Sequence, residues 1–261
     1  MSFYAKAFNY DGIDSDMYNL QIANLDSGLT TNDGSGTVEI IDAFIYRRVK
    51  PYFYGIQYDS KLEFPISFFS PDEITAPMLS FIQNWLFGKL QYKQLAIIQN
   101  DMDDVYIKCI FTEPTIIKAG NVAVGISGTC RMDSQFAYLY PKTLTYASPL
   151  PTSITIYNNS HHPDYLYPTL EFTMGLSGGN FSITNTSDSD RIFTFTGLSA
   201  SETISVNNDL GIVNSSSGSP VLSKFNKNFL RLIPGKNVLT LSGASVSKFD
   251  LTYQFLRRIG P

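Results

Sequence analysis

The chain has 261 residues, of which 43% are hydrophobic, 14% aromatic and only 16% charged, and its formal net charge is −4 at pH 7. This composition excludes an intrinsically disordered chain, which needs low hydrophobicity and high net charge, and it excludes collagen and coiled coils, whose repeats are missing. Because average domains have about 25% charged residues, we expect either a neutral Ser/Thr/Asn surface or a surface covered by other subunits.

In the first half of the chain, apolar and polar residues alternate, which is typical of half-buried β-strands. A short acidic turn at residues 100–104 separates two of the β-rich runs, so these two form a predicted hairpin. The predicted strands begin at Thr37 and otherwise cover Lys61–Phe68, Tyr92–Ile98, Val105–Phe111 and Ala123–Met132.

One segment departs from this pattern and predicts a helix that begins at Ser70. Ser70 is the expected N-cap, Pro71 suits the first helical position, and Glu73 completes a capping box. Pro77 lies inside the segment and predicts a bend or a separate first turn, while Gly88 is the expected end. The apolar residues at helical spacing are Ile74, Met78, Phe81, Ile82 and Trp85.

Five prolines between residues 141 and 168 mark a predicted domain boundary near Ser148, which divides the chain into residues 1–148 and 149–261. The second half contains short β-rich runs separated by Gly, Asn, Ser and Pro, which favours a β-sandwich or jelly roll. The protein is therefore expected to be mainly β. Its predicted later strands are Ser153–Tyr157, Thr169–Met174, Asn180–Asn185, Ile192–Phe195, Glu202–Val206, Phe229–Ile233, Asn237–Ser242 and Lys248–Phe255.

Few residues are suited to catalysis or metal binding. His161 and His162 are the only histidines, and in a strand-like segment adjacent side chains point to opposite sides. The acidic turn Asp101–Asp104 lacks the central Gly and the distant Glu of a calcium loop. No catalytic or phosphate-binding motif is present. We therefore expect no enzyme, no cofactor and no metal site. A glycosidase stays open only as a third hypothesis, because its two catalytic carboxylates can lie far apart in sequence and no pair stands out here.

The remaining composition limits partners and compartment. Cys109 and Cys130 lie in alternating apolar runs, so they are expected to be buried free thiols. The basic pairs Arg47–Arg48 and Arg257–Arg258 are isolated, which argues against a nucleic-acid partner. No apolar run approaches the roughly 20 residues that cross a membrane, and the first residues lack the apolar core of a signal peptide. The expected protein is soluble and made in a cytoplasm.

Three groups of short motifs resemble the distal tail protein (Dit) family of long-tailed siphophages. These are Phe8–Ser15 with Tyr18–Leu20, Ile82–Leu86 with Tyr92–Leu95, and Phe229–Gly243. The third group has a strand, a Pro-Gly turn with Asn, a second strand and a Gly. Pro-Gly suits a tight turn, and Asn tolerates unusual backbone angles. The resemblance spans nearly the whole chain, and it rests on the order and spacing of the motifs taken together.

The resemblance implies a non-enzymatic virion protein of the phage tail tip, synthesised in the cytoplasm of the bacterial host. In that family the N-terminal domain is a β-sandwich with a helix and a hairpin, and it forms a homo-hexameric ring. The ring joins the tail tube protein to the tail-tip (tail-associated) protein, starts baseplate assembly and lets DNA pass without specific binding. The C-terminal domain of the family is a galectin-like jelly-roll β-sandwich, and no membrane contact is implied.

Two departures from the family concern the second domain. Residues 149–261 contain no insertion long enough to be the arm that holds receptor-binding proteins in some members. The galectin sugar signature is also missing, since no Trp occurs after Trp85. The alternative function is a carbohydrate-binding module of a phage tail or baseplate that contacts host cell-wall glycans.

If the ring is correct, its contacts are expected to come from the first half of the chain, where sheet edges can pair across subunits and bury apolar area. The hairpin strands and the segment Gly36–Tyr46 carry the candidates. The predicted interface residues are Ile97, Tyr92, Val105, Ile40 and Phe44.

Overall fold

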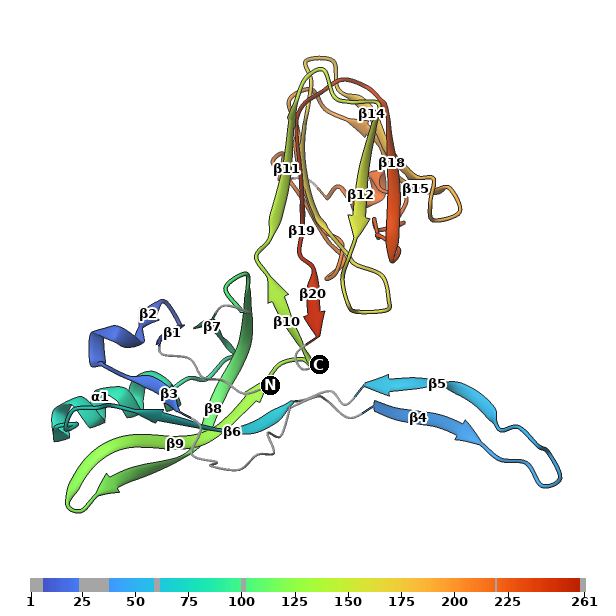
Figure 1. Cartoon of the computed structure of the whole chain (residues 1–261). Helices are drawn as coiled ribbons and strands as arrows, with labels where there is room; N and C mark the ends of the chain where they lie inside the picture. Colours follow the sequence, from blue (N-terminus) through green and yellow to red (C-terminus); the bar gives the residue numbers. More distant parts are fainter. Residues whose placement is uncertain (1–6, 24–37, 59–61, 100–101, 219, 259–261) are drawn as a thin grey trace. The chain divides into compact units, whose positions relative to one another are not determined.

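The computed structural model describes residues 7–23, 38–58, 62–99, 102–218 and 220–258. It has two compact units, drawn in Figure 1: residues 1–138 with 257–261, and residues 139–256. Both units consist mainly of antiparallel strands, and the described residues contain one α-helix, α1 (Ala76–Phe87). The expected mainly β class is therefore confirmed.

The first unit is built on a nine-stranded sheet. Its main order is β2-β1-β7-β8-β9-β6-β3, and β10 pairs with both β8 and β20. The strands are β1 (Ala7–Tyr10), β2 (Ile13–Asp14), β3 (Gln21–Ala23), β6 (Glu63–Phe69), β7 (Lys93–Ile98), β8 (Val105–Ala119), β9 (Val122–Met132), β10 (Phe136–Leu139) and β20 (Leu256–Arg258).

The predicted hairpin is confirmed, because β7 and β8 pair antiparallel with Leu95 opposite Ile107. The turn prediction falls partly on residues 100 and 101, which lie outside the described residues. β8 continues well beyond the predicted Phe111 and pairs along its length with β9. Alternating apolar residues thus located the strands, but not their full length.

The predicted helix start at Ser70 is wrong. α1 begins six residues later, with Thr75 at the N-cap position and Pro77 in the first turn. A proline is tolerated there because the first backbone N–H groups of a helix have no partner within the helix. The buried Ser70 hydroxyl instead accepts a hydrogen bond from the Asp72 N–H at 3.2 Å and so stabilises a local turn. The predicted end at Gly88 is correct.

Aromatic residues join α1 to the sheet of the first unit. The Trp85 indole N–H donates a hydrogen bond to the Tyr10 carbonyl oxygen at 2.9 Å, and its ring stacks on Phe8 with centroids 5.8 Å apart. Cys109 and Cys130 are buried free thiols, as expected. Burial raises the pKa of the Cys109 thiol, which keeps it protonated inside this core.

The second unit is a sandwich of two sheets. One has the order β11-β19-β13-β16-β17, and the other has the order β12-β18-β14-β15. Phe172 from the first sheet and Phe181 from the second lie with ring centroids 4.7 Å apart, so the two apolar faces pack together. The strands are β11 (Lys142–Ala147), β12 (Ser153–Asn158), β13 (Thr169–Met174), β14 (Gly179–Asn185), β15 (Arg191–Leu198), β16 (Thr203–Asn207), β17 (Ile212–Ser215), β18 (Gly235–Gly243) and β19 (Val246–Tyr253).

One predicted strand of this unit, Phe229–Ile233, is wrong. The segment makes only an isolated bridge between Leu232 and Leu166. Buried asparagine side chains bind its backbone instead: Asn208 Oδ1 accepts from the Leu230 N–H at 2.8 Å, and Asn185 Nδ2 donates to the Arg231 carbonyl at 3.1 Å. The backbone groups are satisfied without a neighbouring strand, although the residues are β-formers.

The sequence boundary near Ser148 differs from the limits of the compact units. β11 precedes that boundary, yet it pairs with β19 along its whole length and lies in the second unit. The last described strand, β20, pairs with β10 and crosses the boundary, since Leu256 belongs to the second unit and Arg257 and Arg258 belong to the first. The chain therefore enters the second unit after Tyr138 and leaves it before Arg257.

Candidate assembly surface

The strands β4 (Val38–Ala43) and β5 (Tyr52–Tyr58) form a two-stranded sheet of their own, here called the arm (residues 38–58), which Figure 1 shows as a separate ribbon. The strands pair antiparallel with Ile40 opposite Ile56, and the register shifts after Ile41. Among the described helices and strands, β4 and β5 pack mainly on each other. The arm therefore lacks a core of its own.

The side chains of the arm are unusually apolar for an exposed element. Tyr46 is 88% exposed and Phe44 is 74% exposed, and neighbouring positions on both strands are similar. The exposed large hydrophobic residues here are Ile40, Ile41, Phe44, Ile45, Tyr46, Val49, Tyr52, Phe53 and Tyr54. Apolar residues that gather in one segment mark an interaction surface, whereas single exposed hydrophobic residues need no explanation.

The low stability expected of a two-stranded sheet also indicates that the arm is covered by a partner. An isolated two-stranded hairpin is marginally stable in water, because it buries little apolar area. The outer edges of β4 and β5 also have no paired strand among the described residues, so their backbone groups can accept a further strand. A partner that covers the arm would supply both apolar burial and backbone hydrogen bonds.

The tip of the arm combines aromatic rings with positive charge. The Arg48 guanidinium lies over the Tyr52 ring, 3.8 Å from its centroid, and Arg47 lies 5.4 Å from the centroid of the Tyr46 ring. Lys50 adds a third cation. A guanidinium stacked on an aromatic face keeps its N–H groups at the edge, where they can bind carboxylates. The tip is suited to an acidic and apolar partner surface.

The five interface residues predicted from the sequence fall into a buried group and an exposed group. Ile97 and Val105 are 2% and 1% exposed, so the core of the first unit already covers them and they offer no surface to another chain. Ile40, Phe44 and Tyr92 are exposed, and the first two lie on or beside β4 of the arm. β5 was not predicted from the sequence. Its β-forming aromatic run Tyr52-Phe53-Tyr54 is consistent with a strand, but it lacks the apolar–polar alternation of a half-buried strand.

The described part of the chain holds neither a cluster of metal-binding side chains nor a membrane-spanning helix. In that part of the chain no group of three or more His, Cys, Asp or Glu side chains is placed to hold a metal ion. No described helix is long and apolar enough to cross a bilayer. His161 has a structural contact, since its backbone N–H donates to the Leu256 carbonyl at 2.8 Å.

Two β-rich units and an apolar arm define a protein built for contact with other chains. The sequence matches the family described as phage tail protein N-terminal domain over residues 3–134, and the phage tail C-terminal domain over residues 136–253. The chain therefore belongs to the phage tail protein family. No curated protein matched the sequence.

Solved structures share the fold at low sequence identity. The crystal structure of the Dit protein of phage SPP1, described as a paradigm of the hub adsorption apparatus in phages infecting Gram-positive bacteria, aligns with a TM-score of 0.70 and 11% identity. The alignment covers 95% of this chain and 98% of that one. A chain of the phage P2 baseplate in its activated conformation with calcium aligns with a TM-score of 0.54 and 9% identity. This alignment covers 95% of the present chain and 97% of the baseplate chain. The resemblance to distal tail proteins is confirmed.

Proposed function

We propose that this phage tail protein is a non-enzymatic structural component of the virion that acts as a hub at the tail tip. Six copies form a ring that joins the tail tube protein to the tail-tip protein and leaves a path for DNA. The observation that carries this proposal is the arm, whose exposed apolar side chains and open strand edges require a protein partner. The shared fold with a hub protein supports it.

A ring of identical subunits is built from contacts between two different surfaces of each subunit. Such head-to-tail contacts close into a ring when the rotation from one subunit to the next allows it. The tip of the arm is apolar and basic, so the surface that it contacts should be apolar and acidic. The first unit carries such a region, here called the acidic patch, which is made of Asp16, Met17, Asp72, Glu73 and Phe81. We place the arm of one copy against the acidic patch of the next.

The acidic patch is held in shape by contacts within the unit. The Asn19 amide donates to Asp72 Oδ2 at 2.6 Å, which ties the short helix Ser15–Tyr18 to the segment that precedes α1. Tyr18 stacks on Phe81 with centroids 4.8 Å apart. The patch thus combines the exposed side chains of Met17 and Phe81 with the held carboxylate of Asp72, which matches the mixed character of the arm tip.

The test compares Phe44→Asp with Leu176→Asp, both of which place a carboxylate at a largely exposed apolar position. Phe44 lies in the arm, whereas Leu176 lies in a loop of the second unit. Light scattering after size exclusion should show a hexamer for the wild type and for Leu176→Asp, and a monomer for Phe44→Asp with unchanged circular dichroism. A wild type that stays monomeric at high concentration, also with the tail-tip protein added, contradicts the ring.

A charge exchange tests the proposed pairing of the two surfaces. Arg48→Glu should weaken assembly, because it places like charges together. Mixing this variant with a Glu73→Arg chain should recover larger species, because in an alternating ring every arm tip again faces a patch of opposite charge. If Arg48→Glu assembles as the wild type does, the arm contacts some other surface.

A further inference from the structure

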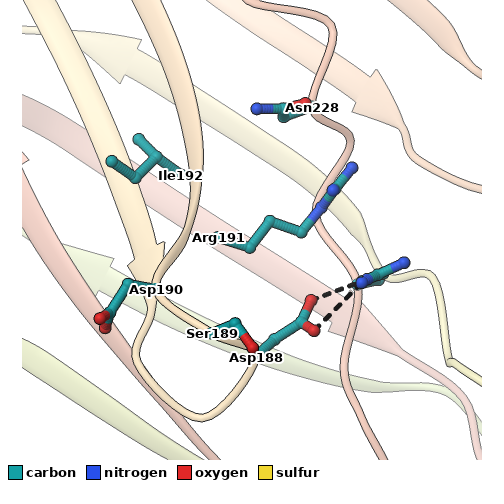
Figure 2. A pocket seen from close by; sticks show the side chains of 7 residues that line it. Asp188, Ser189, Asp190, Arg191, Ile192 and Asn228 are labelled. Atoms are coloured by element: carbon teal, nitrogen blue, oxygen red, sulfur yellow. Dashed lines mark hydrogen bonds and ion pairs between the residues drawn. The ribbon is translucent and has the colours of Figure 1, made fainter.

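The second unit has an open pocket of about 420 Å³ at the end of the β14–β15 hairpin. One wall is the turn after β14 with the start of β15, and the other is the irregular segment that precedes β18. Its main side chains are Asp188, Asp190, Arg191, Ile192, Asn228 and Arg231, which Figure 2 shows from close by. Nothing in the proposed ring uses this pocket.

Hydrogen bonds hold the two walls in a fixed arrangement. Asn226 links them twice, since its Nδ2 donates to the Ile192 carbonyl at 2.8 Å and its Oδ1 accepts from the Thr194 N–H at 3.2 Å. Arg231 donates to both oxygens of the buried Asp188 carboxylate, at 2.7 and 3.1 Å, and stacks on the Tyr165 ring at 3.8 Å. The pocket is preformed, as small-molecule sites usually are.

Several polar groups of the pocket remain available to a ligand. Arg191 uses only its Nε, which donates to the Phe229 carbonyl at 3.3 Å, and its side chain extends toward the segment that carries Asn228 (Figure 2). Within the described part of the chain, the side chains of Asp190 and Asn228 form no hydrogen bond. The lining thus includes guanidinium and amide donors and carboxylate and amide acceptors, with Arg191 and Asn228 on one side of β15 and Asp190 on the other (Figure 2).

The charges of the pocket limit the class of ligand. Two carboxylates, Asp188 and Asp190, balance two guanidinium groups, Arg191 and Arg231, so neither an anion nor a cation has a net attraction. A polar lining also disfavours an apolar ligand. Hydroxyl groups both donate and accept, and the exposed Ile192 side chain can cover the C–H face of a sugar ring. We propose that this pocket binds an uncharged saccharide.

The experiment titrates the full-length protein and follows saturation-transfer NMR signals of the small molecules. The probes are methyl α-glucoside, methyl α-galactoside, N-acetylglucosamine and N-acetylgalactosamine, with glucuronate and inorganic phosphate as charged comparators. Asn228→Ala and Asp190→Ala each remove one polar side chain that lines the pocket from an exposed position. The matched control is Asn214→Ala, an exposed position on β17 of the other sheet.

The expected result is saturable binding of at least one neutral sugar, without competition by phosphate. Asn228→Ala and Asp190→Ala should each weaken it about threefold to tenfold, as loss of one hydrogen bond does, while Asn214→Ala leaves it unchanged. Absence of saturable binding for all neutral probes, tighter binding of glucuronate or phosphate, or equal binding by the variants overturns the proposal. Ring assembly is measured separately by light scattering, so either conclusion can fail alone.

Discussion

The Trp85 indole N–H and the Tyr10 carbonyl oxygen lie 2.9 Å apart and form a buried hydrogen bond between α1 and β1. These residues are 75 positions apart in the chain, so the bond reports the tertiary structure of the first unit. Trp85 is also the only tryptophan, so its fluorescence reports the unfolding of this unit alone.

Trp85→Ala should lower the free energy of unfolding of the first unit by about 3–5 kcal/mol. The change leaves a cavity beside Phe8 and an unpaired Tyr10 carbonyl. Urea unfolding followed by far-UV circular dichroism measures the loss. Tyr157→Phe, at a 56% exposed position of the second unit, is the control and should change stability little. An unshifted transition for Trp85→Ala contradicts the packing described for α1.

Ile97→Asp and Ile40→Asp make the same chemical change in two environments. Ile97 is 2% exposed, so a carboxylate there should cost about 4 kcal/mol or more and leave the first unit unfolded. Ile40 is 62% exposed on the arm, so Ile40→Asp should keep its fold but lose assembly. Circular dichroism with light scattering separates the two effects. A folded but monomeric Ile97→Asp would move the interface to β7.

Asn237→Ala should destabilise the second unit by about 3 kcal/mol. The buried Asn237 side chain accepts from the Ile233 N–H at 2.9 Å and donates to the Ile233 and Gly235 carbonyls at 2.8 and 3.0 Å. Its removal leaves these backbone groups unpaired in the turn before β18. Urea unfolding monitored by circular dichroism measures the change. The matched variant Asn214→Ala, at an exposed position, should stay within about 0.5 kcal/mol of the wild type.

The environment of Glu202 predicts that the second unit loses folding stability in acid. Burial raises the pKa of this carboxyl group, but hydrogen bonds from the Ser215 hydroxyl at 2.5 Å and the Ser199 N–H at 2.7 Å, together with the Lys224 charge and the Ser217 hydroxyl, outweigh burial and lower the pKa. A lowered folded-state pKa stabilises the protein above the unfolded-state value, near about 4.3, and the effect disappears as pH falls through the folded-state pKa.

The stability difference between the wild type and Glu202→Gln should therefore be about 1–3 kcal/mol at pH 7 and shrink below about pH 4. Urea unfolding across this pH range measures it. Glu171→Gln, which removes an exposed carboxylate on β13, is the control and should follow the wild-type curve closely. A difference that is constant with pH would show that Glu202 acts through packing and not through its charge.

Local sequence pattern determined much of the secondary structure. Alternating apolar residues located the β7–β8 hairpin and most strands of the second unit, because a strand with one buried face needs that period. The helix ends at Gly88 as predicted, although the φ of Gly88, −84°, is not the left-handed conformation that usually favours glycine at a helix end. The motif around Asn237 also pointed to a phage tail protein, and the matches over both halves of the chain show that the chain belongs to a phage tail protein family.

Tertiary structure decided the features that depend on distant neighbours. Phe229–Ile233 has strand-forming residues, yet side chains of Asn185 and Asn208 bind its backbone and turn it into one wall of the saccharide pocket. Ile97 and Ile40 are the same residue type in similar β-rich runs. Only the packing of β7 in a sheet and the isolation of the arm make one a core residue and the other a surface residue.

The low charged fraction of the chain illustrates the same division. Composition alone predicted a surface that is either neutral or covered by other subunits. The structure shows that exposed apolar side chains gather on the arm, because two strands without a third layer cannot bury their own side chains. The sequence thus determined which residues are apolar, and the tertiary structure decided which of them remain for another chain to cover.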